Sequence, residues 1–249
     1  MQNRLRKGSL ILPLFLFLML NGCTTIYNPA TERKETFLIN TQYEVSLGSD
    51  MDKQVQNKLT IDNNQAMQGR LERIGNKVAA ASDRQDLAYH FKIVKDNDLN
   101  AFALPGGFVY VNSGLMEKAN DDELAGVVAH EIGHIAARHS VKKLQATLGY
   151  QIVIGLALGI SGQQNMSQAM DIVFNLVSLG YGRKDELLAD KLAVRYSRRA
   201  GFNPNGILTF FEKLEKDAQS KGTTNPPVFL SSHPPVNERI ENIKKEISK

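Results

Sequence analysis

The sequence has one cysteine, no internal repeat, no low-complexity block and no apolar run as long as eighteen residues. A single cysteine cannot form a disulfide within the chain, so disulfide-stabilised scaffolds are excluded. A membrane-spanning helix needs about 20 continuous apolar residues, so the lack of such a run argues against an integral-membrane protein. With 42% hydrophobic residues in 249 positions, the chain can form one sizeable globular domain or two small ones.

The chain has little excess charge of either sign once its first residues are set aside. Its 30 Lys and Arg residues outnumber its 26 Asp and Glu residues, and the pI is near 9.0. The first 22 residues contain Arg4, Arg6 and Lys7 but no acid, so the remainder has a net charge of +1. The basic balance therefore belongs to a targeting segment, and it gives no support for nucleic-acid binding.

The N-terminal residues have the organisation of a secretory signal peptide. A basic head at residues 4–7 precedes an apolar run of about eleven residues, which is too short for a comfortable membrane span. The sequence Leu20-Asn21-Gly22-Cys23 follows and resembles the bacterial lipobox, although Asn21 is unusual at its position. We therefore expect residues 1–22 to be removed and Cys23 to be lipidated. The alternative is an ordinary signal peptide or a short anchor with Cys23 incidental.

Apolar periodicity predicts an α+β fold that is mainly helical. Residues 24–50 show no clear period, so residues 23–50 are interpreted as a lipidated N-terminus and tether before a domain at 51–249. Three short strands are predicted at 88–94, 101–104 and 108–111, forming a small antiparallel sheet. Helices are predicted at 63–81, 120–148, 184–199, 204–220 and 237–247.

The stretch from Leu144 to Met170 has no charged residue. Its apolar centre, Ile152 to Ile160, is only nine residues long, and polar residues at 163–165 end it. A buried or lid-forming helical insertion is therefore favoured over membrane contact.

The sequence His130-Glu131-Ile132-Gly133-His134 has the composition of a metal site. Two histidines four residues apart on a helix can both reach one ion, and zinc prefers neutral imidazole nitrogen. Zinc lowers the pKa of bound water to near neutrality, while Glu131 can accept the proton and later donate it to the leaving amine. A chance H-E-x-x-H in a chain of this length has a probability on the order of half a percent.

The surroundings of this motif also suit a buried helix. Val127, Val128 and Ile135 form an apolar stripe, while Gly126 and Gly133 would let another helix approach closely.

A catalytic zinc site normally has a third protein ligand. His139 follows His134 by five residues, which is about 140° further around a continuous helix, so it is predicted to lie on the surface. His90 falls in a predicted strand and is interpreted as structural.

Glu186 is the better candidate for the third ligand. Asp190 follows four residues later on the same helical face and could accept the free ring N–H of a zinc-bound histidine. Ala189 and Ala193 are small enough for close helix packing. The alternative is a solvated charged face, because Lys184, Asp185 and Lys191 lie nearby.

Four motifs in order resemble the gluzincin metallopeptidases of family 48, which include the CAAX prenyl protease, the HtpX heat-shock protease and periplasmic quality-control proteases. They are Asn-Ala-Phe-Ala-Leu-Pro-Gly-Gly at 100–107, the H-E-x-x-H helix, Glu-Leu-Leu-Ala-Asp at 186–190, and His233-Pro234 followed by Arg239. The resemblance covers most of the mature chain and implies a zincin-like fold. It further implies zinc ligands at His130, His134 and Glu186 and a general base at Glu131.

The resemblance also implies roles for residues outside the central motif. An edge strand made of Ala101, Phe102, Ala103 and Leu104 would pair with an extended substrate backbone. His233 would be a regulatory fourth zinc ligand, and Arg239 would stabilise the oxyanion or brace the site. The alternatives are a loop histidine fixed by its prolines and a plain surface charge.

We therefore predict an endopeptidase with one Zn²⁺ per chain, since two histidines and a carboxylate suit zinc best. It would be lipid-anchored in the bacterial outer membrane, because Thr24 follows the cysteine, and its domain would face the periplasm. Its partners would be unfolded or misassembled envelope proteins and the outer-membrane assembly machinery. The alternative is an envelope assembly factor or chaperone with a latent protease site.

Overall fold

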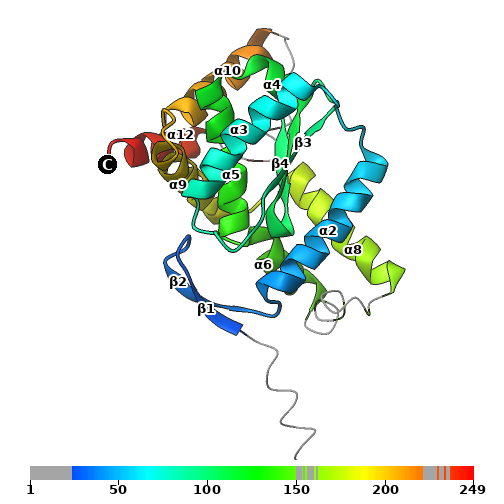
Figure 1. The fold of residues 1–249 in the computed structure, drawn as a ribbon. Helices are drawn as coiled ribbons and strands as arrows, with labels where there is room; N and C mark the ends of the chain where they lie inside the picture. The colour runs from blue at the N-terminus through cyan, green and yellow to red at the C-terminus, as the bar shows by residue number, and fades with distance from the viewer. Residues whose placement is uncertain are drawn as a thin grey trace, which may run out of the picture.

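The computed structural model describes residues 24–149, 153, 155, 160, 162–220, 229, 233 and 236–249. The predicted signal peptide, Cys23 and most of the apolar centre at 152–160 lie outside these residues. Within them the fold is the predicted α+β, mainly helical and zincin-like one (Figure 1).

Helix α5 (Asp121–Ala136) lies at the centre of the molecule and contains the H-E-x-x-H motif. Its first turn has a capping box, in which Asn120 and Glu123 exchange side-chain and backbone hydrogen bonds. Every residue of α5 from Glu123 onward is buried. Both histidines are therefore buried, at 0% and 1% exposure.

The sheet consists of β3 (His90–Val94), β4 (Ala101–Leu104) and β5 (Phe108–Asn112), in the order β3-β5-β4. The antiparallel prediction holds for β4 and β5 but is wrong for β3 and β5, which are parallel. Strand β5 lies between the two strands that precede it in the chain, so β4 is at an edge of this sheet.

The tight β4–β5 connection depends on glycine. It contains the short η2 turn (Pro105–Gly107), in which Gly106 and Gly107 have φ of 77° and 101°. Any side chain at Gly107 would lie 2.3 Å from the Ala88 carbonyl oxygen.

Alternate residues of the sheet contribute to two separate cores. Ala101 and Ala103 belong to the core shared with α5, whereas Phe102 and Leu104 belong to the second core. That second core is built against α2 (Thr41–Lys58).

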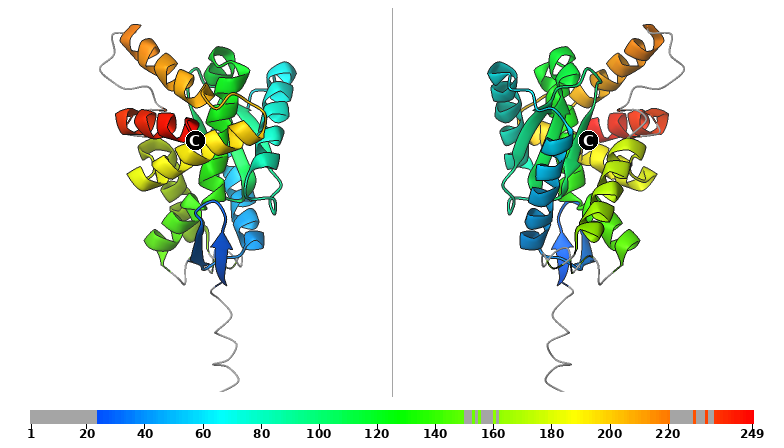
Figure 2. Two further views of the ribbon diagram at one scale, coloured as in Figure 1. Left: turned by 90° about the vertical axis from the view of Figure 1, so that its left-hand side faces the viewer. Right: turned by 90° about the vertical axis from the view of Figure 1, so that its right-hand side faces the viewer.

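The prediction of an irregular tether at 24–50 is wrong. A hairpin of β1 (Thr24–Asn28) and β2 (Arg33–Phe37) precedes α2, and the boundary proposed at residue 51 falls inside that helix. The buried positions of α2 include Glu44 and Gly48 beside Leu47 and Val55, so its apolar period is interrupted. The hairpin lies at the opposite end of the molecule from α10 (Gly206–Ser220) (Figure 2).

The other helices are α3 (Gln65–Ala81), α4 (Ser113–Lys118), α6 (His139–Leu148), α8 (Gln163–Leu179), α9 (Arg183–Arg199), α10 (Gly206–Ser220) and α12 (Val236–Ile247). Helices α3, α9, α10 and α12 confirm the predicted positions to within a few residues, whereas α4 was not predicted. Helix α8 overlaps the end of the predicted helical insertion.

The two glycines of α5 mark where other helices touch it. A Cβ on Gly126 would lie 2.6 Å from the Ile207 nitrogen of α10, and one on Gly133 would lie 3.2 Å from the Ala189 carbonyl of α9. The predicted close approach is confirmed.

The helix predicted at 120–148 is two helices, α5 and α6. The chain turns at Arg138, which has left-handed φ and ψ of 55° and 37°. Its side chain donates to the Ile39 carbonyl, forms an ion pair with Glu44 and lies over the ring of Phe37. These contacts from distant residues favour a conformation that costs a non-glycine residue about 1 kcal/mol or more.

The uncharged insertion is represented here by the end of α6 and by α8, which packs against α6 and β4. None of the helices in the described ranges is long and apolar enough to cross a membrane.

Candidate metal centre

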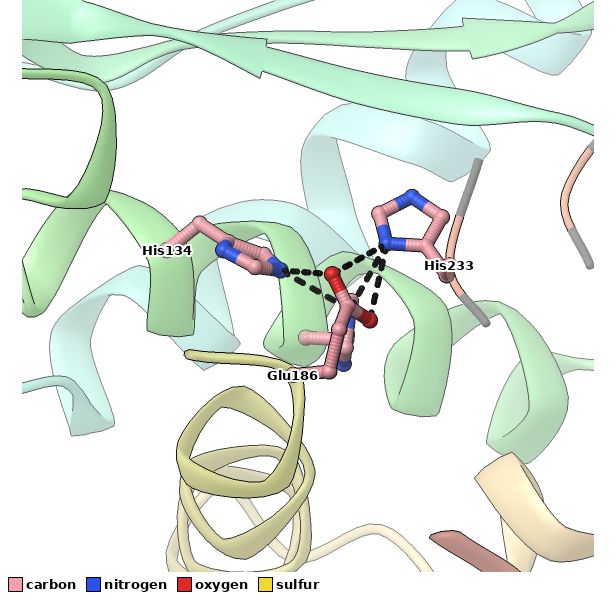
Figure 3. Close-up of side chains that lie close together, drawn as sticks. His134, Glu186 and His233 are labelled. Atoms are coloured by element: carbon pink, nitrogen blue, oxygen red, sulfur yellow. Dashed lines mark hydrogen bonds and ion pairs between the residues drawn. The ribbon is translucent and has the colours of Figure 1, made fainter. Parts of the chain in front are cut away.

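Four buried side chains meet beneath the sheet. One ligand atom from each of His130, His134, Glu186 and His233 can be chosen so that all four lie within 4.8 Å of one another. The histidines of α5 face Glu186 from α9 and His233, which precedes α12. Figure 3 shows Glu186 between His134 and His233.

The spacing of these atoms fits a tetrahedral ion. Ligand atoms that bind zinc at about 2.0 Å lie about 3.3 Å from one another. Nε2 of His130 is 3.0 Å from Nε2 of His134 and 3.3 Å from Nδ1 of His233. Each Nε2 is also 3.5 Å from a Glu186 oxygen. The cluster has the size and donor types of a zinc site.

His130 is held from behind by a carboxylate. Its Nδ1 lies 3.0 Å from Oδ1 of Asp190, closer than Nη2 of Arg239 at 3.5 Å. Arg239 donates to both oxygens of Asp190, at 2.8 and 2.6 Å. A His130 Nδ1–H that donates to Asp190 leaves the lone pair of Nε2 facing the cluster.

His134 has a different neighbour behind it, which sequence reasoning missed. Its Nδ1 is 2.8 Å from Nδ1 of His139, and its ring stacks on Tyr181 at 4.0 Å. The predicted surface position of His139 is wrong: the residue is 3% exposed, because the chain turns at Arg138. Burial and nearby Lys142 lower the pKa of His139 to about 3, so its ring is neutral at pH 7.

The electrostatics of the cluster favour a positive charge at its centre. Burial raises the pKa of Glu186, but His233 and His130 bring it well below its usual value. Burial lowers the pKa of His130, but hydrogen bonds with Asp190 and Glu186 raise it to about 9. Burial holds the pKa of His134 well below its ordinary value. At pH 7 Glu186 is therefore ionised, His134 is neutral and His130 is protonated, so a divalent cation would bind in place of the His130 proton.

Residues 65–247, most of the chain, match Peptidase family M48. The chain belongs to this family. Among similar proteins, metalloprotease YcaL of Escherichia coli K12 is 34% identical over 164 residues, which cover 64% of this chain and 62% of YcaL. Metalloprotease LoiP of the same organism is 32% identical over 182 residues, or 72% of this chain and 70% of LoiP. The beta-barrel assembly-enhancing protease of Yersinia pestis is 30% identical over 188 residues, or 69% of this chain and 37% of that protein.

In this M48 protein the glutamate of the motif, Glu131, is buried beside the cluster, near His233. Glu131 is 1% exposed, and its Oε1 has no hydrogen-bond partner among the described residues. That oxygen lies 3.7 Å from Nε2 of His233. Burial raises the pKa of Glu131, although His233 and His130 oppose the shift. A buried carboxylate oxygen that accepts no hydrogen bond and lies beside the cluster is suited to accept a proton from water.

His233 enters the cluster through Nδ1, which is 3.0 and 3.1 Å from the two oxygens of Glu186. Its ring packs on Phe229, and its carbonyl oxygen accepts a hydrogen bond from Arg239. The next two prolines, on which the loop interpretation rested, lie outside the described residues.

Arg239 is fully buried, so its interpretation as a surface charge is wrong. Its guanidinium is engaged by Asp190, by the His233 carbonyl and by Glu186, at 3.2 Å. Because its donors are already engaged by these groups, Arg239 is better suited to hold Asp190 and His233 in place than to donate to an oxyanion.

The predicted substrate strand occupies an edge, but it is not open on its faces. All four residues of β4 are buried, and Phe102 stacks on Tyr110 at 4.8 Å. Helix α8 contacts this strand. The proposed pairing with substrate can therefore involve only the backbone edge of β4.

Proposed function

We propose that this M48 protein is a zinc-dependent endopeptidase in which His130, His134 and Glu186 bind the ion. The observation that carries the proposal is the 3.0 Å separation of two Nε2 atoms whose rings are both occupied at Nδ1. Two lone pairs at this distance would repel each other, so a positive charge must lie between the nitrogens, and zinc would take the place of the proton on His130. The ionised Glu186 supplies the third donor.

Bound zinc would act as a Lewis acid and lower the pKa of water to near neutrality. Glu131 would accept the proton of the attacking water at its unpartnered Oε1 and transfer it to the leaving amine. Asp190 orients His130 and is itself held by Arg239.

The substrates would be unfolded or misassembled envelope polypeptides. Backbone pairing to the edge of β4, at Ala101 to Leu104, would select extended chains with little preference for side chains. The name of the Yersinia pestis relative, a beta-barrel assembly-enhancing protease, supports an envelope role and a link with outer-membrane assembly.

We also propose that residues 1–22 are removed and that acylated Cys23 anchors the chain in the outer membrane, facing the periplasm. Since β1 begins at Thr24, the anchor would adjoin the folded domain directly.

A second candidate is an assembly factor or chaperone whose protease site is latent. It is favoured by His233, whose Nδ1 lies among the ligand atoms and could hold the fourth zinc position closed.

The experiment that tests the proposal is metal analysis coupled to casein cleavage by the full-length lipoprotein in detergent. Wild type should contain one zinc per chain and lose its activity with chelator, while Glu131→Gln should keep the zinc and lose activity by about 10²- to 10⁴-fold. Zinc-bound wild type without chelator-sensitive cleavage would favour the assembly factor. Full complementation of a deletion strain by Glu131→Gln would do the same.

A further inference from the structure

The turn between α5 and α6 brings a third histidine behind the metal cluster. Nδ1 of His139 lies 2.8 Å from Nδ1 of His134, and Nε2 of His139 lies 3.5 Å from Oδ1 of Asp185. Both rings are buried, and Asp185 is half exposed. The three groups form a line that runs from the cluster toward the surface.

The short distance between two nitrogens of the same type restricts the positions of the hydrogens. One Nδ1 must carry the hydrogen and the other must accept it. If His134 donates, its Nε2 has a lone pair that faces Glu186, and the hydrogen of His139 is on the Nε2 nearest Asp185. If His139 donates instead, the hydrogen of neutral His134 is on Nε2 and blocks the metal. Only the first arrangement allows His134 to be a ligand.

The ring plane of His134 is constrained by a second contact. Tyr181 stacks on it with an interplanar angle of 21°, and its hydroxyl lies 2.7 Å from the hydroxyl of Ser140, the residue after His139. The turn at Arg138 thus positions two groups: His139, which contacts Nδ1 of His134, and Ser140, whose hydroxyl holds Tyr181.

We propose that His139 is a positioning residue that selects the metal-binding tautomer of His134 and orients its ring. This role depends on the zinc site of the proposed function. Loss of a group that hydrogen-bonds a ligating histidine typically weakens metal binding by 10- to 100-fold. The alternative is that His139 only fills space in the core.

Three substitutions separate these roles. His139→Asn keeps an acceptor oxygen near the position of Nδ1, whereas His139→Leu fills similar space without an acceptor. His139→Gln can place its amide only near the position of Nε2, and it serves if the leucine variant fails to fold. Asp185→Asn is the control at the half-exposed end of the line, because it removes the charge of Asp185 but keeps an acceptor oxygen near Nε2 of His139.

The measurement is zinc affinity of the full-length lipoprotein in detergent, by competition with a chromogenic chelator, with the visible spectrum of the cobalt form as a second readout. We expect a 10- to 100-fold loss for the leucine and glutamine variants and a distorted cobalt spectrum. The asparagine variant and Asp185→Asn should stay within a few-fold of wild type. Thermal unfolding of each chelated protein reports on folding separately.

Equal zinc affinity in wild type and His139→Leu, or in His139→Asn and His139→Gln, would refute the positioning role while leaving the zinc site intact. A wild-type chain that binds no zinc would refute the proposed function and, with it, the role of His139.

Discussion

His130 and His134 lie one turn apart on the same helix and face the same point, but their surroundings differ. Behind His130 are the carboxylate of Asp190 and the guanidinium of Arg239. Behind His134 are the neutral ring of His139 and the stacked ring of Tyr181. On the first side Asp190, together with Glu186, raises the pKa of His130 to about 9 against burial and Arg239, whereas on the second side burial lowers the pKa of His134. Two equivalent ligands in the motif are therefore not equivalent in chemistry.

The largest loss of stability should come from a substitution on the charged side of the site, which is formed by Asp190 and Arg239 behind His130. Asp190→Ala leaves Arg239 fully buried without its main partner, and we expect it to reduce the free energy of unfolding by about 3–5 kcal/mol. Asp185→Ala, on the same helix but half exposed, should cost less than about 1 kcal/mol. Urea unfolding measures both. A cost for Asp190→Ala as small as that for Asp185→Ala would show that the two sides do not differ.

The other side can be weakened without touching either histidine. Arg138→Ala removes the ion pair with Glu44 and the hydrogen bond to Ile39, and we expect a loss of about 1–3 kcal/mol in the free energy of unfolding. Arg138→Gly removes the same contacts but tolerates a φ of 55°, so it should be more stable than the alanine variant by about 1 kcal/mol. Chemical denaturation of the pair isolates the backbone contribution, and an alanine variant at least as stable as the glycine variant would argue against strain there.

The charged side should also produce a pH dependence above pH 6.5, whereas the lowered pKa values of His134 and His139 affect stability only below that pH. The pKa of about 9 for His130 lies above its ordinary value of 6.5. In chelator-treated protein its stabilising contribution is therefore complete below pH 6.5 and is lost as the pH rises to 9. Zinc must displace the same proton, so the apparent zinc affinity should rise by up to about tenfold per pH unit over this interval. Urea unfolding of the chelated protein and zinc titrations, each at several pH values, measure how stability and zinc affinity change with pH.

Asp190→Asn is the control, because it removes the main group that raises the pKa of His130. Both slopes should flatten in this variant. Slopes that are unchanged would mean that another group titrates between pH 6.5 and 9.

The smallest effect should come from the aromatic contact. Tyr181→Leu removes the ring that stacks on His134, and we expect a loss of about 0.5–1.5 kcal/mol in stability and a few-fold in zinc affinity. Tyr181→Phe loses only the hydroxyl contact with Ser140 and should retain zinc affinity. If the phenylalanine variant is the weaker zinc binder, the hydroxyl rather than the ring positions His134.

Local patterns predicted one side of the site much better than the other. His130, His134, Glu186 and Asp190 follow from four-residue spacing on two helices, because such residues share a face whatever surrounds them. The position of His139 depends on the turn at Arg138, where the sequence has no glycine or proline that would predict a turn. That turn is favoured by Arg138 contacts with residues about one hundred positions away in the chain.

The remaining errors in the fold have a similar origin. The antiparallel prediction is wrong for β3 because β3 pairs in parallel with β5, and short-range alternation cannot specify which strands pair or in which direction. Helix α2 was missed because Glu44 lies on its buried face, where it is matched by Arg138 and Arg84 rather than by apolar neighbours. In both cases the deciding interaction joins distant parts of the sequence.

The end of α5 is held by residues that precede the part of the chain matched to the family. Asn28 donates to the carbonyl of Ala136, and Ile39 accepts from Arg138, whereas the family match begins at residue 65. A protein trimmed to residues 65–247 would keep every metal ligand but lose the clamp that turns His139 toward His134. Its site would be complete in composition, but we expect its geometry to be looser, because residues of the N-terminal segment fix the end of α5.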